Sequence, residues 1–427
     1  MTPSAILAAT IEIIEEQETR PGPLDLIVGR YQRQRRYIGA KDRSALANRV
    51  FGLARRHFRL GWRLEQAGAP TSPRARVIAD LLLCDGLEPD EISSLFNGGS
   101  HAPPELNTSE WSWLLRIGPS PLETAEMPVA VRLECPSWAW DGLYDAFNDR
   151  TELQLSALLK EAPLDLRVNT LKSDRRSALA AIKRAGFDAE LTPLANTGIR
   201  LPHRVALGRL PGLLEGVVDP QDEGSQLAAM ALAPKPGERI ADFCAGAGGK
   251  ALAMAAAMGN KGRILALDAD KRRLDQAGPR LSKAGVDIVE RRPISNGRDP
   301  WLKRQVAKFD GVLIDAPCSG VGAWRRNPDA RWGRGQPDLA KLTELQSSIL
   351  DRAARLVRPG GRLVYVTCSL LPQENQIQTD AFLTRSEDFS YASQIDFPIQ
   401  VPNGHITLTP ADTETDGFFI AWLQRKI

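Results

Sequence analysis

The chain has 427 residues, of which 43% are hydrophobic and 25% are charged, and its formal net charge is +3. These values are typical of a folded protein with two or three domains and argue against a disordered chain. No apolar run approaches the roughly 18 to 20 residues that span a bilayer, and the acidic N-terminus lacks a signal-peptide pattern. We therefore expect a cytoplasmic protein with no membrane partner.

The charge is distributed unevenly along the first third of the chain. Residues 20–63 hold twelve Lys or Arg and two acids, a net charge of +10, whereas residues 64–150 hold five basic residues and fourteen acids, a net charge of −9. The block "RYQRQRRYIGAKDR" (30–43) mixes Arg with Tyr, which suits contacts with phosphates and stacking on bases. A solvated helix face would explain the block equally well.

Helical periodicity dominates the first part of the sequence. Ile6, Ile13 and Ile14 mark one apolar face, and a second is marked within residues 44–60 by Leu46, Val50, Leu53 and Ala54. We expect an all-helical domain over residues 1–130.

A smaller segment is expected over residues 131–220. Residues 138–162 have a helical pattern, and Leu164, Leu166 and Val168 then alternate as in a strand. A further helix is expected to end at Gly186. The sequence therefore predicts a small α/β segment between the helical domain and the rest of the chain.

From about Gly224 onward, strand patterns alternate with helical ones. Strands are expected at 239–243, 263–268, 286–290, 309–315 and 362–367. Helical patterns separate most of them, including a long one over 338–361. This alternation predicts a doubly wound parallel sheet in an α/β domain over residues 221–427.

The first of these strands runs into a glycine-rich loop, "DFCAGAGGKA" (242–251). Gly246, Gly248 and Gly249 let the chain turn sharply and let a ligand approach the start of a helix. The second strand ends on Asp268, where an acid can bind ribose hydroxyls. Because Lys250 does not stand in the P-loop pattern G-x-x-x-x-G-K-[ST], an NTPase is disfavoured. Glycine spacing alone does not separate a dinucleotide from S-adenosylmethionine.

Two later strands each end beside a thiol: "IDAPCSG" (314–320) contains Cys318, and "TCS" (367–369) contains Cys368. Methyl transfer to carbon 5 of cytosine needs such a group, because that carbon is a poor nucleophile until a thiolate adds to carbon 6. A base must then remove the carbon-5 proton, and a carboxylate such as Asp315 can hold or supply the proton at N3. An NAD-dependent oxidoreductase would use the glycines but neither thiol. With no C-x-x-C pair, no metal site is expected.

These motifs resemble those of the Sun (RsmB-type) family of RNA 5-methylcytosine methyltransferases. The family's paired signature is similar to "DAPCSG" with "TCS". Further similar motifs follow in order: "PLDLRVNTLK" (163–172), "QDEGSQ" (221–226), "CAGAGGK" (244–250), "RRNPDARW" (325–332) and "DGFFIAWL" (416–423). The resemblance covers the chain from about residue 135, and "KDRSALANRVFGLARRHFR" (41–59) resembles, less sharply, a NusB-like helical domain.

The resemblance implies a class I (Rossmann-like) methyltransferase domain that uses S-adenosylmethionine. It makes Cys368 the nucleophile and Cys318 the residue that promotes release, with Lys250 between cofactor, Asp315 and target base. The implied cofactor-binding residues are Cys244, Ala245, Gly246, Ala247, Gly248, Gly249, Lys250, Asp268, Asn296 and Asp315.

The resemblance further implies an RNA partner. Small-subunit ribosomal RNA is the expected substrate, methylated by a monomer, with tRNA as the alternative. From another class, the chain could be a catalytically silent RNA-binding ribosome-assembly factor, although intact Cys318, Cys368, Asp315 and Lys250 argue against that.

One departure from the family pattern leads to a prediction. Where the family usually shows Asp-Gly-Arg, this chain has Asn296-Gly297-Arg298, and an amide brings no charge. We predict that Asn296→Asp is tolerated and tightens S-adenosylmethionine binding by about 1 kcal/mol, through one charge-assisted hydrogen bond. Calorimetric titration measures this affinity, and a loss of tenfold or more would contradict the placement of Asn296 in the cofactor site.

Overall fold

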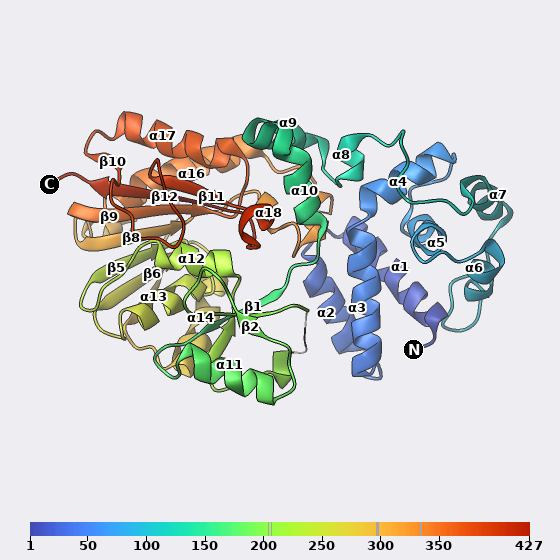
Figure 1. Cartoon of the computed structure of the whole chain (residues 1–427), viewed down its shortest axis with the longest axis horizontal. Coiled ribbons are helices and arrows are strands. Elements are labelled where there is room, and N and C mark those ends of the chain that lie inside the picture. Colours follow the sequence, from blue (N-terminus) through green and yellow to red (C-terminus); the bar gives the residue numbers. More distant parts are fainter. Residues whose placement is uncertain (204, 206, 296–298, 334) are drawn as a thin grey trace. The chain divides into compact units, whose positions relative to one another are not determined.

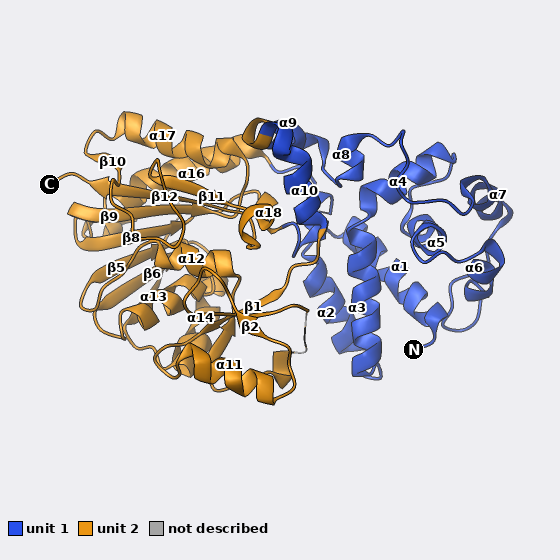
Figure 2. Ribbon diagram, viewed as in Figure 1, with its two compact units in different colours: residues 1–144, 148–159, 324–337 blue, residues 145–147, 160–323, 338–427 orange. Residues whose placement is uncertain are grey.

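The computed structural model describes residues 1–203, 205, 207–295, 299–333 and 335–427 (Figure 1). The chain divides into two compact units, coloured separately in Figure 2. Unit 1 comprises residues 1–144, 148–159 and 324–337, and unit 2 comprises residues 145–147, 160–323 and 338–427. The expected domain limits near residues 130 and 220, and the NusB-like character of the first domain, stay predictions.

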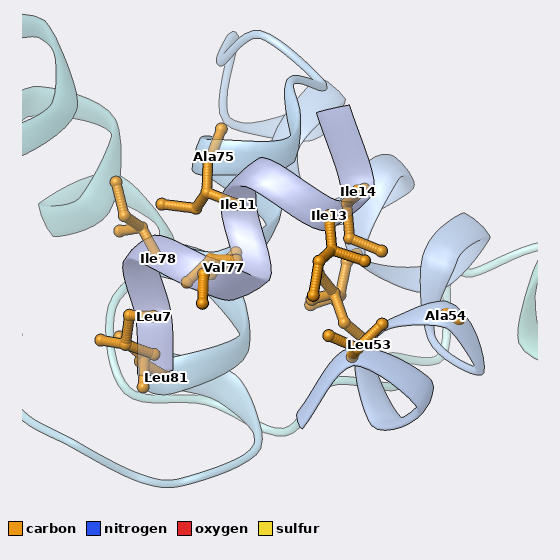
Figure 3. Packing of buried hydrophobic residues seen from close by; sticks show 14 of the residues in the cluster. Leu7, Ile11, Ile13, Ile14, Leu53, Ala54, Ala75, Val77, Ile78 and Leu81 are labelled. Atoms are coloured by element: carbon orange, nitrogen blue, oxygen red, sulfur yellow. The ribbon is translucent and has the colours of Figure 1, made fainter. Parts of the chain in front are cut away.

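Unit 1 is built from helices, as the periodicity of its sequence predicts. They are α1 (Pro3–Thr19), α2 (Leu24–Gln34), α3 (Ala40–Ala54), α4 (His57–Gln66), α5 (Pro73–Leu83), α6 (Pro89–Leu95), α7 (Thr108–Ile117), α8 (Val129–Arg132), most of α9 (Ser137–Phe147) and α10 (Thr151–Leu159). Figure 3 shows the core where α1, α3 and α5 meet. Ile13 and Ile14 of α1 and Leu53 and Ala54 of α3 are buried there, as predicted, while Ile6 is only partly buried. None of the described helices is long and apolar enough to cross a membrane.

Residues 324–337, which we call the inserted segment, leave unit 2 and pack within unit 1. Asp329 accepts a hydrogen bond at 3.2 Å from the backbone N–H of Leu24, the first residue of α2. At the end of α3, Trp332 donates from Nε1 to the carbonyl of Ala54 at 3.3 Å. The Trp332 indole also stacks on His57, with ring centroids 4.1 Å apart. The inserted segment thus supplies partners for helix ends that have unpaired backbone groups.

A buried carboxylate caps helix α4 from a distance. The residue before α4, Arg56, makes no side-chain cap. Instead, the carboxylate of Glu134 accepts from the backbone N–H groups of Phe58 at 2.9 Å and Arg59 at 3.0 Å. Glu134 is fully buried and also accepts from the Arg59 guanidinium at 3.0 Å. Its negative charge therefore lies at the positive end of the helix dipole.

Unit 2 begins with a small four-stranded sheet of order β2-β3-β1-β4 and one helix, which lies between β1 and β2 in the chain. Its elements are β1 (Leu164–Val168), α11 (Arg175–Arg184), β2 (Glu190–Leu191), β3 (Gly198–Leu201) and β4 (Val218–Pro220). β1 pairs antiparallel with both β3 and β4. The predicted strand after residue 163 and the helix that follows it are both present, although the helix ends at Arg184 rather than at Gly186.

The larger sheet has the order β10-β12-β9-β8-β5-β6-β7, with β11 paired to β12. Its strands are β5 (Arg239–Phe243), β6 (Arg263–Asp268), β7 (Val289–Pro293), β8 (Phe309–Asp315), β9 (Val357–Thr367), β10 (Phe389–Tyr391), β11 (His405–Leu408) and β12 (Phe418–Arg425). The five strands β5 to β9 are parallel, and β12 is antiparallel to β9. The chain reverses its strand order at β5, which lies between β6 and β8. The predicted doubly wound sheet is confirmed, and its switch point is where ligands bind in such folds.

Helices cover both faces of this sheet, as Figure 1 shows. One face packs on α12 (Glu223–Met230), α13 (Gly249–Ala257) and α14 (Lys271–Ala284), and the other on α16 (Leu339–Ala354) and α17 (Gln376–Arg385). The short helices α15 (Pro300–Lys303) and α18 (Pro410–Thr413) lie in connections. Because side chains alternate along a strand, Leu313 of β8 faces the first core while Val312 and Ile314 face the second.

Further predicted elements differ from the structure, among them the strand expected at 362–367, which is β9 and begins five residues earlier, at Val357. The strand expected at 286–290 is β7 at Val289–Pro293, because Gly285 ends α14 in a left-handed conformation and residues 286–288 then return to the sheet. The helix expected over 338–361 ends at Ala354, because Pro359 and two glycines cannot continue it, and β9 already begins at Val357. The helical pattern over 138–162 is broken at Asn148, which adopts a positive φ of 48°.

The distant cap on α4 leads to a stability prediction. Glu134→Ala removes the acceptor of two helical N–H groups and leaves Arg59 without its buried partner, so unit 1 should lose about 3 kcal/mol of unfolding free energy. Urea unfolding followed by tryptophan fluorescence reports this unit, because seven of the nine tryptophans lie in it. Glu152→Ala is the control, since Glu152 pairs with Arg132 at an exposed site, and it should leave the transition almost unchanged. Equal effects of the two variants would contradict the capping role.

Candidate active site

The loop between β5 and α13 forms a tight turn whose backbone is tied to the next strand. Gly246 and Gly248 have φ values of +52° and +77°, which favour glycine. A Cβ atom at Gly248 would lie 2.9 Å from the Cβ atom of Ala277, so a side chain has no room there. The backbone N–H of Gly246 donates to Asp268 Oδ2 at 2.7 Å. The glycine loop and the acid at the end of β6 therefore form one structure.

A cavity of about 500 Å³ opens beside this loop at the ends of the parallel strands. Its walls come from the ends of strands β5 to β9 with the connections that follow them, and from helix α16. The lining residues are Phe243, Cys244, Asp268, Ala269, Asp270, Arg273, Ile294, Asp315, Ala316, Pro317, Cys318, Leu345, Ile349, Arg352 and Cys368. This volume lies within the range of small-molecule and cofactor pockets.

Lys250, in the first turn of α13, forms a buried ion pair with the acid at the end of β8. Its Nζ lies 2.7 Å from Asp315 Oδ2, and the Lys250 side chain is 10% exposed whereas that of Asp315 is 36% exposed. Burial alone would lower the pKa of Lys250, but the charge and hydrogen bond of Asp315 reverse this, and the pKa is raised. The ammonium group therefore stays protonated at neutral pH.

A second carboxylate, Asp242 on β5, lies fully buried in the same region. Burial, reinforced by the charge of Asp315, raises the pKa of Asp242 to about 7, although Lys250 acts in the opposite direction. Two acids, Asp315 and Asp242, thus act on the Lys250 ammonium, and Asp268 lies close enough to Asp242 to affect its charge. The cost of burying like charges together is met by keeping Asp242 partly protonated.

The two strand-end thiols lie in contact. The Sγ atoms of Cys318 and Cys368 are 3.3 Å apart, close enough for one thiol to donate a hydrogen bond to the other. The backbone N–H of Gly322 donates to the carbonyl of Cys368 at 2.9 Å, which joins the two loops behind the thiols. The hydrogen bond with Cys368, together with burial, holds the pKa of Cys318 well above its ordinary value.

Most of the predicted site residues come together. Cys244, Asp268, Asp315, Cys318 and Cys368 line the cavity, and the predicted loop residues Ala245, Gly246, Ala247, Gly248 and Gly249 form the turn beside it. Lys250 reaches the cavity through Asp315. Burial, with the charges of Asp268 and Asp315, raises the pKa of Cys244, which fits an uncharged packing thiol. Asn296 lies outside the described residues. The roles assigned to these residues stay predictions.

Sequence reasoning missed a polar cluster beside the thiols, made of the half-buried Ser319 and the buried Ser369 and Glu374. The carboxylate of Glu374 accepts hydrogen bonds from both serines. One signal was present, because "TCSLLPQEN" (367–375) places an acid soon after an apolar strand. The cavity residues Leu345, Ile349 and Arg352 were also missed, since they follow the ordinary spacing of helix α16 and carry no separate signal.

The residues around the cavity fit S-adenosylmethionine. Phe243, Ile294 and Ile349 give apolar walls for an adenine ring, and the Asp268 carboxylate borders the glycine loop where ribose hydroxyls would bind. Acids and guanidinium groups line the same cavity, which suits a cofactor that carries a sulfonium, an amine and a carboxylate.

Known families match most of unit 2. The model described as "16S rRNA methyltransferase RsmB/F" matches residues 229–424, and the model described as "Methyltr_RsmF/B-like, ferredoxin-like domain" matches residues 135–207. The ribosomal RNA small subunit methyltransferases B of Salmonella typhi and Salmonella arizonae are each 36% identical over 293 residues. Those alignments cover 68% of this chain and 66% of each relative, slightly under two thirds of the relatives' length.

Solved structures agree with this match. The crystal structure of PH0851 covers 100% of this chain and 99% of its own, with 26% identity and a TM-score of 0.81. A methyltransferase homologue from Pyrococcus horikoshii is 30% identical, with 70% of this chain and 97% of that chain covered and a TM-score of 0.59. NSun6 from the same organism, solved with SFG, shares the fold at 20% identity and a TM-score of 0.61, with 69% and 99% covered.

The glycine loop, the strand-end acid and the cofactor-sized cavity agree with these matches, which cover residues 135–207 and 229–424. The chain therefore belongs to the RsmB/RsmF family of methyltransferases, whose methyl donor is S-adenosylmethionine.

Proposed function

We propose that this protein methylates carbon 5 of a cytosine in structured RNA, with small-subunit ribosomal RNA as its substrate. Two thiols 3.3 Å apart at the edge of the cofactor cavity carry this proposal. S-adenosylmethionine, when bound, supplies an electrophilic methyl group. The Salmonella relatives are named as methyltransferases of small-subunit ribosomal RNA, which supports the substrate class.

We assign different roles to the two thiols. In the proposed mechanism the Cys368 thiolate adds to carbon 6 of the cytosine, which makes carbon 5 nucleophilic enough to take the methyl group. A base then removes the carbon-5 proton, and the bond between carbon 6 and Cys368 breaks to free the product. Cys318 promotes this release. The hydrogen bond with Cys368, together with burial, raises the pKa of Cys318, so Cys318 is a neutral thiol before the attack.

Asp315 and Lys250 hold the ring. Asp315 borders the cavity with 36% of its side chain exposed, so its carboxylate can hold or supply the proton at N3 of the cytosine. The buried Lys250 ammonium fixes the carboxylate in place through their 2.7 Å contact. A base must leave its stack or come from an unpaired region to reach these groups, so the proposed target is an accessible cytosine.

The target RNA can be tested directly. Bisulfite sequencing of total RNA from cells with and without this protein should show one or more 5-methylcytosine signals lost from small-subunit ribosomal RNA. A signal lost from tRNA instead would assign the protein to the alternative substrate. No lost signal would favour a silent RNA-binding assembly factor. We place the protein in the cytoplasm because that RNA is assembled and used there, and we propose that it acts as a monomer.

We predict different failures for the two cysteine variants. Cys368→Ala should give no methyl transfer and no protein–RNA adduct, because it lacks the attacking thiol. Cys318→Ala should still attack and methylate once, but its product should stay bonded to Cys368. A denaturing gel with labelled RNA should therefore show a retarded band for Cys318→Ala only. The reverse pattern would assign attack to Cys318, and filter binding of the same RNA checks that both variants still bind it.

We also propose that unit 1 contributes RNA affinity through α2 and the link to α3. In the structure, some side chains of the Arg/Tyr block (residues 30–43) are paired or buried, and others are exposed and unpaired within the described chain. Arg30 and Arg35 form ion pairs with Glu16 and Glu12 of α1. Tyr31 is buried, whereas Tyr37 is 77% exposed.

Three basic side chains remain for phosphates. Arg33, Arg36 and Lys41 are exposed, and no ion pair within the described chain involves them. With the exposed Tyr37 among them, they combine open positive charge with an aromatic ring, a combination that suits RNA. We call these four residues the basic patch.

The basic patch gives a prediction that can be measured without catalysis. Replacing Arg33, Arg36 and Lys41 by Ser should weaken RNA binding and reduce the slope of log affinity against log salt by about 2 to 3, since each phosphate contact contributes roughly 0.7 to 0.9. The matched control is Arg30→Ser with Arg35→Ser in the same stretch of the chain. The charges of these two residues are already balanced by Glu16 and Glu12, so the slope should change less. S-adenosylmethionine binding should be unaffected in both proteins. An unchanged slope in the triple variant would show that the basic patch is only solvated.

A further inference from the structure

The acid Glu374 lies behind the two thiols, in a short 3₁₀ turn at Pro372–Glu374 that follows β9. It is fully buried, and within the described chain no ion pair reaches it. Its Oε1 accepts hydrogen bonds from the backbone N–H of Ser319 at 2.8 Å and from Gln346 Nε2 at 3.0 Å. Its Oε2 accepts from the hydroxyls of Ser319 and Ser369, both at 2.5 Å. Four donors thus compensate a charge whose burial without partners would be costly.

The two serines are the residues that directly follow the two cysteines. Ser319 follows Cys318 in the loop after β8, and Ser369 follows Cys368 in the loop after β9. Their hydroxyl oxygens lie 3.2 Å apart, and one carboxylate oxygen binds both. A single group therefore joins the two cysteine loops one residue away from each thiol.

Glu374 is itself anchored to β9. Its carbonyl accepts from the hydroxyl of Tyr365 at 2.8 Å. The next residue, Asn375, accepts from Thr367 at 2.5 Å and donates to the carbonyl of Ser369 at 2.9 Å. Because hydrogen bonds hold the Glu374 carbonyl and the Asn375 side chain, the backbone that carries the carboxylate is fixed beside the end of β9.

We propose that Glu374 is a positioning residue that holds the two cysteine loops in one geometry, so that Cys318 and Cys368 reach the same substrate base. This proposal deepens the function proposed above and rests on it. Glu374 does not touch the cavity; it acts through Ser319 and Ser369. The negative charge of Glu374 also helps to raise the pKa of Cys318, behind the larger effects of the Cys368 hydrogen bond and burial.

The closeness of the thiols can be measured without RNA or cofactor. In a glutathione buffer, oxidation of the two thiols to a disulfide reduces one oxidised glutathione to two reduced molecules, and the equilibrium gives the effective concentration of one thiol near the other. Peptide mapping identifies the Cys318–Cys368 bond among the five cysteines of the chain. Thiols held 3.3 Å apart should have a high effective concentration in the full-length protein.

Two variants separate geometry from charge. Glu374→Gln keeps an amide oxygen for the Ser319 N–H and Gln346, and the two serine hydroxyls can rotate to accept from its NH₂ group. Its effective thiol concentration should stay within about threefold of the natural protein. Glu374→Ala removes the carboxylate that binds both loops and leaves only the Ser319–Ser369 hydroxyl contact and the Gly322–Cys368 hydrogen bond between them. It should lower that concentration at least tenfold. The exposed acid Glu387 is the matched control, and Glu387→Ala should change nothing.

Methylation gives the second measurement. Single-turnover methyl transfer should fall at least tenfold in Glu374→Ala and be largely restored in Glu374→Gln, while the Kd for S-adenosylmethionine should be the same in both. An effective thiol concentration in Glu374→Ala within twofold of the natural protein would overturn the proposal. Equal losses in the Gln and Ala variants would also overturn it, because charge rather than geometry would then be responsible.

Two further controls keep the test decisive. If Glu374→Ala does not fold, Ser319→Ala with Ser369→Ala removes the two hydroxyl links and leaves the acid in place; an unchanged thiol equilibrium in that protein would overturn the proposal. If Glu374→Ala folds, adding Ser319→Ala and Ser369→Ala to it should have little further effect, because Glu374 acts through these two serines. Failure of the proposed function would appear as an absent adduct in Cys318→Ala, and the thiol equilibrium would still report on Glu374.

Discussion

The parallel ladder between β8 and β9 pairs Asp315 with Val366, so both strands reach the same edge of the sheet almost in register. Everything at the proposed catalytic centre depends on this alignment. It places the loops that follow the two strands side by side, which brings Cys318 to within 3.3 Å of Cys368. On its other side β8 pairs with β5, whose own end leads into the glycine loop and Lys250. Three adjacent strands thus deliver cofactor loop, acid and thiols to one edge.

Burial then sets the protonation of these groups. Lys250 would tend to lose its proton in an apolar surrounding, and Asp315 prevents this. For Asp242, burial and the charge of Asp315 favour the protonated acid and raise its pKa to about 7. Cys318 is kept neutral by its neighbour thiol and by burial. The site therefore contains several ionisable groups but limits how many are charged at once, which is the condition for bringing them so close.

The sequence was most informative where one residue decides the local structure. Strands β5, β6 and β8 have the predicted bounds, because each is a short apolar run that ends on a glycine loop or an acid. β7 was placed three residues too early, because nothing in "GVDIVE" (285–290) marks where the chain rejoins the sheet.

The surroundings of single side chains were harder to predict. Tyr31 and Tyr37 look alike in the sequence, yet only tertiary packing buries the first and exposes the second. Glu374 was missed because its partners are the two serines beside the cysteines and Gln346 on α16, which only the folded sheet brings together. Patterns along the chain identify ligand-bearing loops, whereas buried hydrogen-bond partners depend on contacts between distant residues.

The inserted segment has a consequence for how the chain can be made. Helices α2 and α3 leave the ribosome long before Asp329 and Trp332, because residues 160–323 of unit 2 must be synthesised in between. Leu24 and Asp329 are 305 residues apart, and Ala54 and Trp332 are 278 apart. At about 5 to 20 residues per second, the delay is on the order of fifteen to sixty seconds. During that time the first backbone N–H of α2 and the last carbonyl of α3 have only water as a partner for these bonds. The helical unit reaches its final hydrogen bonding only after β8 and the Cys318 loop have been translated, so the order of synthesis makes completion of the first unit depend on the second.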